Sequence, residues 1–231
     1  DMMTAALAGL VDKYRLKGER LGDVSLGAVI RHSGDWNLAR ECVLGSGLSP
    51  ETPAFDLVRA CGTSLEAAIT IGNKIALGQI DAGIAGGSDT ISDTPIVYPT
   101  VYKQMLLASA RGRSLGQKLK PWLKLRPRFF KPAFPGVSEP RTGLSMGEST
   151  ELTAKEWGIT REAQDELAFA SHRNAAAAYA EGFYEDLLVP FQGVTQDNNV
   201  RADTSQEKLA KLKPAFDRSA SGTMTAGNST P

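Results

Sequence analysis

The sequence has 231 residues, of which 42% are apolar and 23% are charged, as expected for a globular protein with a sizeable core. Lys and Arg equal Asp and Glu at 26 each, so the net charge gives no indication of binding to nucleic acid or a membrane surface. Two cysteines are too few for a disulfide framework, and no apolar run reaches the roughly 18 residues that a membrane span needs. These exclusions leave a protein of a reducing compartment whose two thiols are free.

Helical and strand patterns alternate along the first ninety residues. Helices are predicted over residues 4–14, 37–44 and 64–77, and strands over residues 24–30, 55–58 and 82–87. The apolar face of the first helix consists of Met3, Leu7, Leu10, Val11 and Tyr14. Apolar strands separated by helices predict an α/β fold built around a layered sheet.

Residues 94–138 interrupt this alternation and hold the charge asymmetry of the chain. They contain no acidic residue and nine basic ones: Lys103, Arg111, Arg113, Lys118, Lys120, Lys124, Arg126, Arg128 and Lys131. The rest of the chain has 17 basic against 26 acidic residues. Pro121, Pro127, Pro132 and Pro135 in this segment argue against one continuous helix.

Two hypotheses fit this basic segment. It is either a solvated loop whose charges balance the acidic remainder, or a docking surface. The apolar residues that interleave with its cations are Trp122, Leu123, Leu125, Phe129, Phe130 and Phe134. Such a mixture suits an acidic partner subunit or an anionic membrane surface.

The pattern becomes helical again after Glu139. One helix is predicted over residues 146–157, and Thr160 is the predicted N-cap of a second helix that runs to about residue 180. A short strand is predicted over residues 188–191, and the sequence stops in a Gly- and Asn-rich turn. Because both ends look cut, we expect a fragment of a longer chain.

Cys61 is the best candidate for a catalytic residue. The segment RACGTS places its thiol between a predicted strand and a predicted helix, where unpaired amides stabilise negative charge. Gly62 lets backbone N–H groups approach a substrate oxygen, as an oxyanion site requires. The alternative is a buried cysteine with a purely structural role.

The other reactive side chains are weaker candidates. Cys42 lies among the apolar residues of a predicted helix, which favours core packing. His32 lies in a loop and His172 on a predicted solvated helix face, and neither is a convincing base for Cys61. No spacing fits a zinc site, a phosphate-binding loop or a dinucleotide fingerprint.

Four segments, in order along the chain, resemble the thiolase family. They are RACGTSLEAA (59–68), GGSDTISD (86–93), SMGESTELTAKEWGITREAQDELAFASHRNA (145–175) and KLKPAFDRSASGTMTAGNSTP (211–231). The basic segment and PRTGLSMG (140–147) are most similar to β-subunits of trifunctional fatty-acid oxidation complexes and their bacterial relatives.

The resemblance implies a fold and a division into domains. The fold would be a layered thiolase-like α/β fold, with a mixed N-terminal sheet and a mainly helical loop domain, and with the C-terminal half absent. Residues 1–93 would form an incomplete N-terminal domain and residues 94–215 the loop domain. Residues 216–231 would return into the N-terminal domain.

The resemblance also implies a reaction and its substrates. Cys61 would carry an acyl group between a 3-oxoacyl-CoA and coenzyme A, in thiolytic cleavage or the reverse condensation. Coenzyme A would be a substrate, with no permanently bound cofactor and no metal. Cytoplasmic homodimers or tetramers are expected, with mitochondria as the alternative compartment and a hydratase/dehydrogenase subunit as a further partner.

Five further positions match the family's coenzyme A site. Arg201 would face the adenine or the phosphates, and Phe216 would pack on the pantetheine. Ala226 and Thr230 would hydrogen-bond the pantetheine, and Met146 would lie beside its thiol end and the acyl pocket.

The family's catalytic His, Asn and second Cys would lie in the C-terminal half, so residues 1–231 alone are expected to be inactive. Two alternatives stay open at this stage. One is a condensing enzyme of the 3-oxoacyl synthase type, and the other is a homologue that binds coenzyme A without catalysis.

Overall fold

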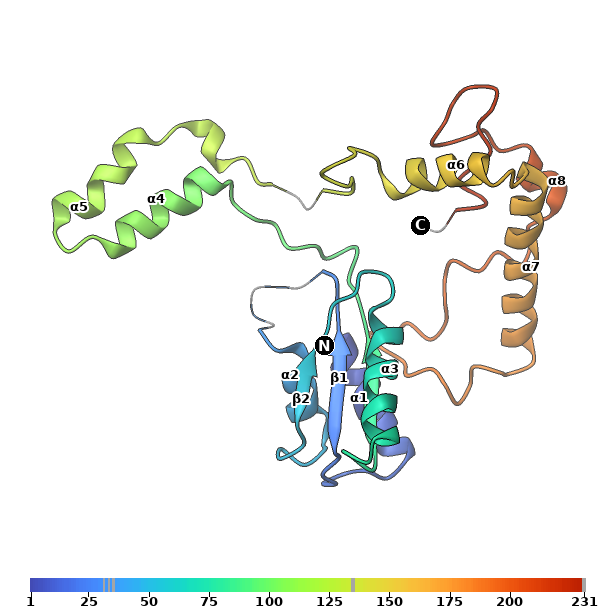
Figure 1. Cartoon of the computed structure of the whole chain (residues 1–231), viewed down its shortest axis with the longest axis horizontal. Coiled ribbons are helices and arrows are strands. Elements are labelled where there is room, and N and C mark those ends of the chain that lie inside the picture. Colours follow the sequence, from blue (N-terminus) through green and yellow to red (C-terminus); the bar gives the residue numbers. More distant parts are fainter. Residues whose placement is uncertain (31, 33, 35, 134–135, 230–231) are drawn as a thin grey trace. The chain divides into compact units, whose positions relative to one another are not determined.

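The computed structural model describes residues 1–30, 32, 34, 36–133 and 136–229, which form two compact units. The first unit comprises residues 1–135 and the second residues 136–231. Figure 1 shows the elements of each unit along the chain. The domain bounds given above stay a prediction.

The first unit contains a three-stranded parallel sheet. Strands β1 (Asp23–Gly27), β2 (Ala54–Asp56) and β3 (Gly83–Gly87) lie in the order β2-β1-β3, with Ser25 opposite both Phe55 and Ala85. Helices α1 (Met2–Lys13), α2 (Leu38–Ser46) and α3 (Thr63–Ala76) alternate with the strands along the chain. The predicted α/β class is therefore confirmed.

One face of the sheet makes the hydrophobic core with α1 and α2. Its members are Met3, Leu7, Val11, Val24, Leu26, Ala39, Cys42, Val43 and Leu48. Cys42 is only 1% exposed, and its sulfur accepts a hydrogen bond from the Thr4 hydroxyl at 3.5 Å. The predicted packing role of Cys42 is thus confirmed.

The opposite face of the sheet is lined with small residues, which lets α3 lie close to the strands (Figure 1). A Cβ atom at Gly27 would lie 2.1 Å from the Leu57 carbonyl oxygen and 2.4 Å from Cγ2 of Thr63. A Cβ atom at Gly83 would lie 2.9 Å from Cγ2 of Ile71 on α3. Any larger side chain at these positions would push α3 away from the sheet.

Two carboxylates bind backbone N–H groups between the end of β1 and the first turn of α2. Asp56 accepts hydrogen bonds from the N–H groups of Leu38 and Ala39 at 3.0 and 2.8 Å, which pairs two free donors at the start of α2. Asp89 accepts from the N–H groups of Val29 and Ile30 at 3.2 and 2.7 Å. The strand predicted over residues 24–30 ends at Gly27, and the amides of Val29 and Ile30 bond to the Asp89 side chain and not to a neighbouring strand.

Residues 94–133 of the basic segment fold into a helical hairpin within the first unit (Figure 1). It comprises α4 (Thr100–Arg111), α5 (Leu115–Leu119) and the 3₁₀ helices η1 (Lys120–Lys124) and η2 (Pro127–Phe130). The Tyr102 ring is its centre, with ring centroids 4.8 Å from Tyr98, 6.2 Å from Trp122 and 5.2 Å from Phe130. The prolines interrupt the helical path, as predicted.

The second unit is mainly helical and contains α6 (Met146–Glu156), α7 (Arg161–Ala180) and α8 (Gln206–Ala210). Ser145 and Glu148 form a reciprocal capping box at α6, and the Thr160 hydroxyl caps α7. The strand predicted over residues 188–191 is wrong. Phe191 pairs only with Val194 in an isolated bridge, since Pro190 has no N–H to donate to a ladder.

Within the described ranges, no helix combines the length and the apolar character needed to cross a membrane.

Candidate functional site

Cys61 lies in an exposed turn between β2 and the start of α3. Ala60, immediately before it, has a φ angle of 42°, a left-handed conformation that costs a non-glycine residue free energy. Such strain persists only where the surrounding structure holds it. The turn therefore presents the thiol to solvent in a fixed backbone frame.

Thr63 is the residue that holds this frame. Its hydroxyl donates to the Ala60 carbonyl at 2.8 Å and accepts from the Arg59 N–H at 2.9 Å. The N–H of Gly62 donates to the Arg59 carbonyl at 2.9 Å. The N–H of Gly62 is thus used inside the turn, and a role of Gly62 beside the nucleophile stays a prediction.

The two histidines belong to different units and have different environments. Nε2 of His32 lies 3.7 Å from a carboxylate oxygen of Asp93 in the first unit. In the second unit, Nδ1 of His172 accepts the N–H of Arg201 at 3.3 Å. His172 is half-buried, so the predicted solvated face is wrong at this position, because the 201 loop packs against α7.

One face of α6 contacts the segment 216–224 of the second unit. Gly147, Glu151 and Lys155 are spaced four residues apart and so lie on one side of the helix. A Cβ atom at Gly147 would lie only 2.0 Å from Cε1 of Phe216, so the Phe216 ring packs directly on the helix backbone. Lys155 forms an ion pair with Asp217 and donates to the Ser221 hydroxyl at 3.3 Å.

Glu151 makes the central contact of this face. Its carboxylate accepts the Thr223 N–H at 2.8 Å, the Thr223 hydroxyl at 2.9 Å and the Met224 N–H at 2.8 Å. Burial alone would raise the pKa of Glu151, but the hydrogen bonds from Met224 and Thr223, together with the nearby Lys155 charge, lower that pKa. This carboxylate therefore stabilises the fold above its usual pKa of 4.5, and the contribution is lost as the pH falls through the lowered value.

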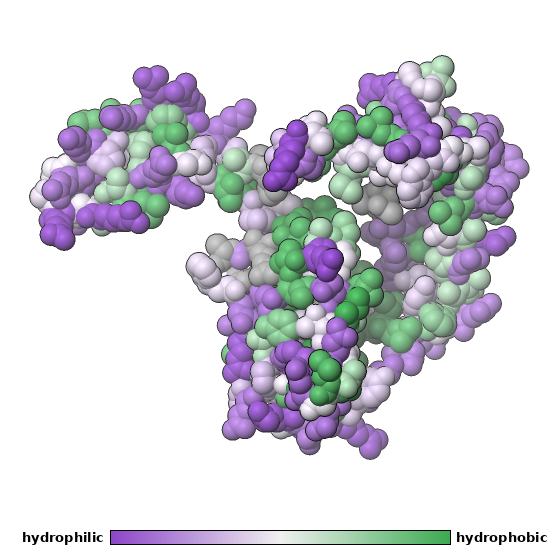
Figure 2. All heavy atoms as spheres, in the orientation of Figure 1, coloured by the Kyte–Doolittle hydropathy of each residue, from purple (hydrophilic) through white to green (hydrophobic). Residues whose placement is uncertain are grey.

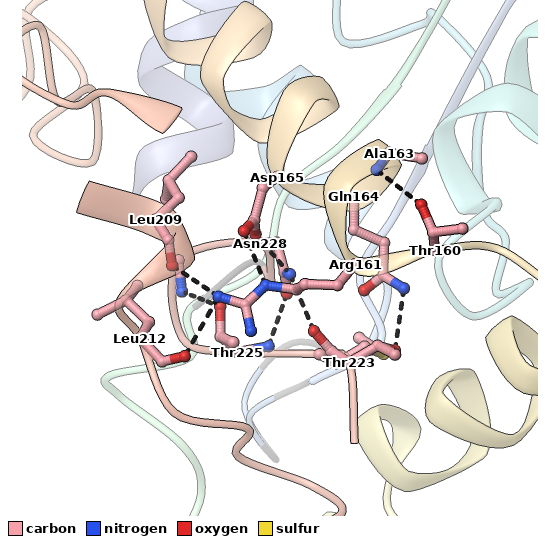
Figure 3. A network of polar contacts seen from close by, with 12 residues as sticks. Thr160, Arg161, Ala163, Gln164, Asp165, Leu209, Leu212, Thr223, Thr225 and Asn228 are labelled. Carbon is pink, nitrogen blue, oxygen red and sulfur yellow. Dashed lines mark hydrogen bonds and ion pairs between the residues drawn. The ribbon is translucent and has the colours of Figure 1, made fainter. Parts of the chain in front are cut away.

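A second network holds the same turn from α7, as Figure 3 shows. The buried Asp165 accepts Nε of Arg161 at 2.7 Å and Nδ2 of Asn228 at 2.9 Å. Asn228 in turn accepts the Thr225 N–H at 2.7 Å. The guanidinium of Arg161 also donates to the Leu209 carbonyl at 2.6 Å, which attaches α8. The turn 223–228 is thus fixed by side chains of two helices.

The predicted coenzyme A residues are distributed over three places. Met146 begins α6 and is 71% exposed. Phe216 packs on Gly147, the residue that follows Met146 in this helix. Ala226 is exposed at the tip of the turn that the two networks hold, and Arg201 lies beside α7. Thr230 lies outside the described residues.

A groove of about 260 Å³ runs beside this face of α6. It is lined by Leu144, Glu148, Glu151, Leu152, Lys155, Phe216, Asp217 and Arg218. No three metal-ligating side chains of the described ranges lie together as a metal site would require.

Sequence reasoning does not single out Glu151 or Asp165, although both are buried and structurally central. Their partners in the turn 223–228 are 72 and 63 residues away along the chain, so no local motif marks these anchoring contacts. The one sequence signal that could have marked Glu151 is the four-residue spacing of Gly147, Glu151 and Lys155, which places them on one face of a helix.

Comparisons with known proteins agree with this architecture. Residues 1–231 match the family model "Thiolase, N-terminal domain". The chain is 42% identical over 231 residues to a 3-ketoacyl-CoA thiolase of Erwinia tasmaniensis, covering 96% of the chain and 52% of that protein. It is 39% identical over 237 residues to a 3-ketoacyl-CoA thiolase of Yersinia pestis (strain Pestoides F), covering 100% and 54%. The chain therefore spans about half the length of the curated relatives it matches.

The fold is similar to a solved structure as well. The crystal structure of the Bacillus anthracis acetyl-CoA acetyltransferase matches with a TM-score of 0.75 and 25% sequence identity. The match covers 97% of this chain and 54% of that one. By sequence and by fold, the chain belongs to the thiolase family.

Proposed function

We propose that the protein containing this chain is a thiolase that transfers an acyl group between a 3-oxoacyl-CoA and coenzyme A through Cys61. The observation that supports this most strongly is the exposed Cys61 thiol on a strained turn before α3, in a chain of the thiolase family. A cysteine with only a packing role has no need of a strained, solvent-facing turn.

The proposed reaction has two covalent steps. The Cys61 thiolate attacks the 3-carbonyl carbon of the substrate, and the bond between C2 and C3 breaks. The electron pair of that bond stays on C2, which takes a proton and leaves as acetyl-CoA. The thiolate of a second coenzyme A then attacks the acyl-cysteine thioester, releases the shortened acyl-CoA and restores the Cys61 thiolate.

In this proposal the second unit binds coenzyme A. Phe216 packs on the pantetheine, and Met146 lies beside its thiol end. The turn that carries Ala226 hydrogen-bonds the pantetheine together with Thr230, and Arg201 faces the adenine or the phosphates. The contacts of Phe216 and of the turn with α6 support this assignment, because they fix both elements on one helix face.

Gly147→Ala should raise KM for coenzyme A. The added Cβ atom would lie 2.0 Å from Cε1 of Phe216, so the ring must leave its place. Loss of one aromatic contact corresponds to roughly a tenfold increase in KM. Steady-state thiolysis with varied coenzyme A measures this. Gly136→Ala is the control, because a Cβ atom there meets nothing within 4 Å, and an equal KM in both variants would contradict the placement of Phe216.

A thiolysis assay of the full-length protein tests the proposed function. With a series of 3-oxoacyl-CoA substrates and coenzyme A, we expect acetyl-CoA and an acyl-CoA shortened by two carbons. Condensation without thiolysis under these conditions would favour the synthase alternative. Binding of coenzyme A with no turnover of any substrate would favour the non-catalytic alternative.

We further propose that the protein is a homo-oligomer of the bacterial cytoplasm. We also propose that the helical hairpin formed by residues 94–133 docks an acidic partner subunit. Leu115, Leu119 and Leu123 follow one another at four-residue spacing and are 79%, 61% and 85% exposed. The basic residues interleave with these leucines, and Figure 2 shows the mixed hydrophilic and hydrophobic surface of the hairpin. Apolar anchors surrounded by cations fit a surface with acidic residues and apolar pockets.

Replacing Lys120, Lys124, Arg126, Arg128 and Lys131 with Gln should weaken this association without changing thiolysis of a soluble substrate. Five lost charges reduce electrostatic attraction, so co-purification with a hydratase/dehydrogenase subunit should fall, with a salt dependence weaker than in the wild type. Binding to anionic vesicles in place of the subunit would assign the hairpin to a membrane. Absence of both associations in the wild type at low salt would show a solvated loop.

A further inference from the structure

The turn at residues 223–228 has an unusual anchor, a buried carboxylate on a helix. Glu151 is 2% exposed; its Oε1 accepts the N–H and the hydroxyl of Thr223, and its Oε2 accepts the N–H of Met224. Burying a carboxylate is costly unless several donors surround it. The three donors here all belong to one turn, so the buried carboxylate holds that turn in a single conformation.

Three residues on one face of α6, Gly147, Glu151 and Lys155, contact the segment 216–224 in different ways. Gly147 meets the Phe216 ring, and Lys155 meets both Asp217 and Ser221, which places both ends of the segment 216–221 on α6. Glu151 lies between them and is the residue of this face that fixes the backbone of residues 223 and 224. One helix therefore sets the position of Phe216 and of the turn together.

The turn ends in a second fixed point. Asn228 bonds to Asp165 of α7 and to the Thr225 N–H, and Thr225 is fully buried. Between the two fixed points only Ala226 is exposed. The backbone at Ala226 is therefore held from both sides and presented to solvent, as a preorganised binding element requires.

We propose that Glu151 is a positioning residue for coenzyme A, which acts by holding the turn that presents Ala226 beside Phe216. This inference rests on the proposed function. Glu151 itself does not touch the ligand, so its contribution appears in coenzyme A affinity rather than in the chemistry at Cys61. Loss of a carboxylate that accepts two backbone N–H groups should weaken binding by roughly tenfold.

The test compares Glu151→Gln with Glu151→Asp and Glu139→Gln in the full-length protein. Glu139 is the matched control, because its exposed carboxylate also accepts two backbone N–H groups, those of Arg141 and Thr142. Calorimetric titration with coenzyme A gives Kd independently of catalysis, and thiolysis gives kcat and KM. Thermal unfolding reports whether each variant is folded.

Glu151→Gln should raise both Kd and KM for coenzyme A roughly tenfold and leave kcat at saturating coenzyme A within about twofold. Glu151→Asp keeps the charge on a shorter stem and should give a smaller increase, while Glu139→Gln should match the wild type. A lowered kcat with unchanged Kd and KM would overturn the inference. Unfolding of both Glu151 variants would also overturn it, because Glu151 would then support the fold as a whole. A wild-type protein that binds no coenzyme A would instead contradict the proposed function.

Discussion

Cys61→Ser should reduce thiolysis by the full-length protein by at least about 10⁴-fold while leaving the protein folded. The thiol of Cys61 is exposed, and its turn is held by Thr63 and by backbone contacts that the sulfur does not make. Exchange of sulfur for oxygen therefore removes the nucleophile without removing a packing contact. The measurements are kcat for thiolysis and the thermal unfolding curve of the same preparation.

Cys42→Ala is the matched control for this loss. Cys42 is the second cysteine of the chain and is buried in the core with α1 and β1. Its replacement should lower stability by roughly 1 kcal/mol, because a small cavity forms, and should leave kcat unchanged. Loss of turnover in Cys42→Ala with full turnover in Cys61→Ser would reverse the assignment of the two cysteines.

Gly27→Ala should destabilise the protein by about 3 kcal/mol, more than a typical surface substitution. The new Cβ atom would lie 2.1 Å from the Leu57 carbonyl oxygen, which is backbone and cannot rotate away. It would also lie 2.4 Å from Cγ2 of Thr63, the residue that holds the Cys61 turn. Relief of the first clash moves the chain after β2 and relief of the second moves the start of α3, and Cys61 lies between them, so turnover should fall together with stability.

Gly116→Ala is the control for Gly27→Ala. Gly116 lies in α5, where a Cβ atom meets nothing within 4 Å, so alanine should be neutral or stabilise by a few tenths of a kcal/mol. Denaturant unfolding of the full-length variants gives both values. Equal stability of the two variants would show that α3 does not depend on the close approach at Gly27.

The α/β core is predictable because its signals are local. Periodicity predicts the buried face of α1: Met3, Leu7 and Val11 are buried and Leu10 packs against them. Tyr14, just past the last helical residue, is exposed, so its predicted place on this face is wrong. The predicted N-cap at Thr160 and the break of helices at prolines in residues 94–138 depend only on neighbouring residues, and both are confirmed.

The packing of α3 shows where such signals fail. Its large apolar residues Leu65 and Ile69 are exposed, whereas Ala67 and Ile71 face the sheet. Which side of α3 meets the sheet depends on the space left by Gly27, Gly83 and Gly87, and no pattern within the helix contains that information.

The candidate site divides in the same way. The position of Cys61 between a strand and a helix follows from the residues next to it, and the structure places it there. The anchoring roles of Glu151 and Asp165 depend on partners in the turn 223–228, far away in sequence. A carboxylate on a helix ordinarily faces solvent, so hydropathy alone predicts the wrong environment for both residues.

The acyl adduct is the most direct measure of the central claim. The full-length protein would be incubated with a 3-oxoacyl-CoA in the absence of free coenzyme A, digested, and its peptides weighed by mass spectrometry. We predict one acyl group per chain, on the peptide that contains Cys61, and its release by added coenzyme A. Thiolysis that proceeds with no adduct at Cys61, or with the adduct on Cys42, would contradict the account.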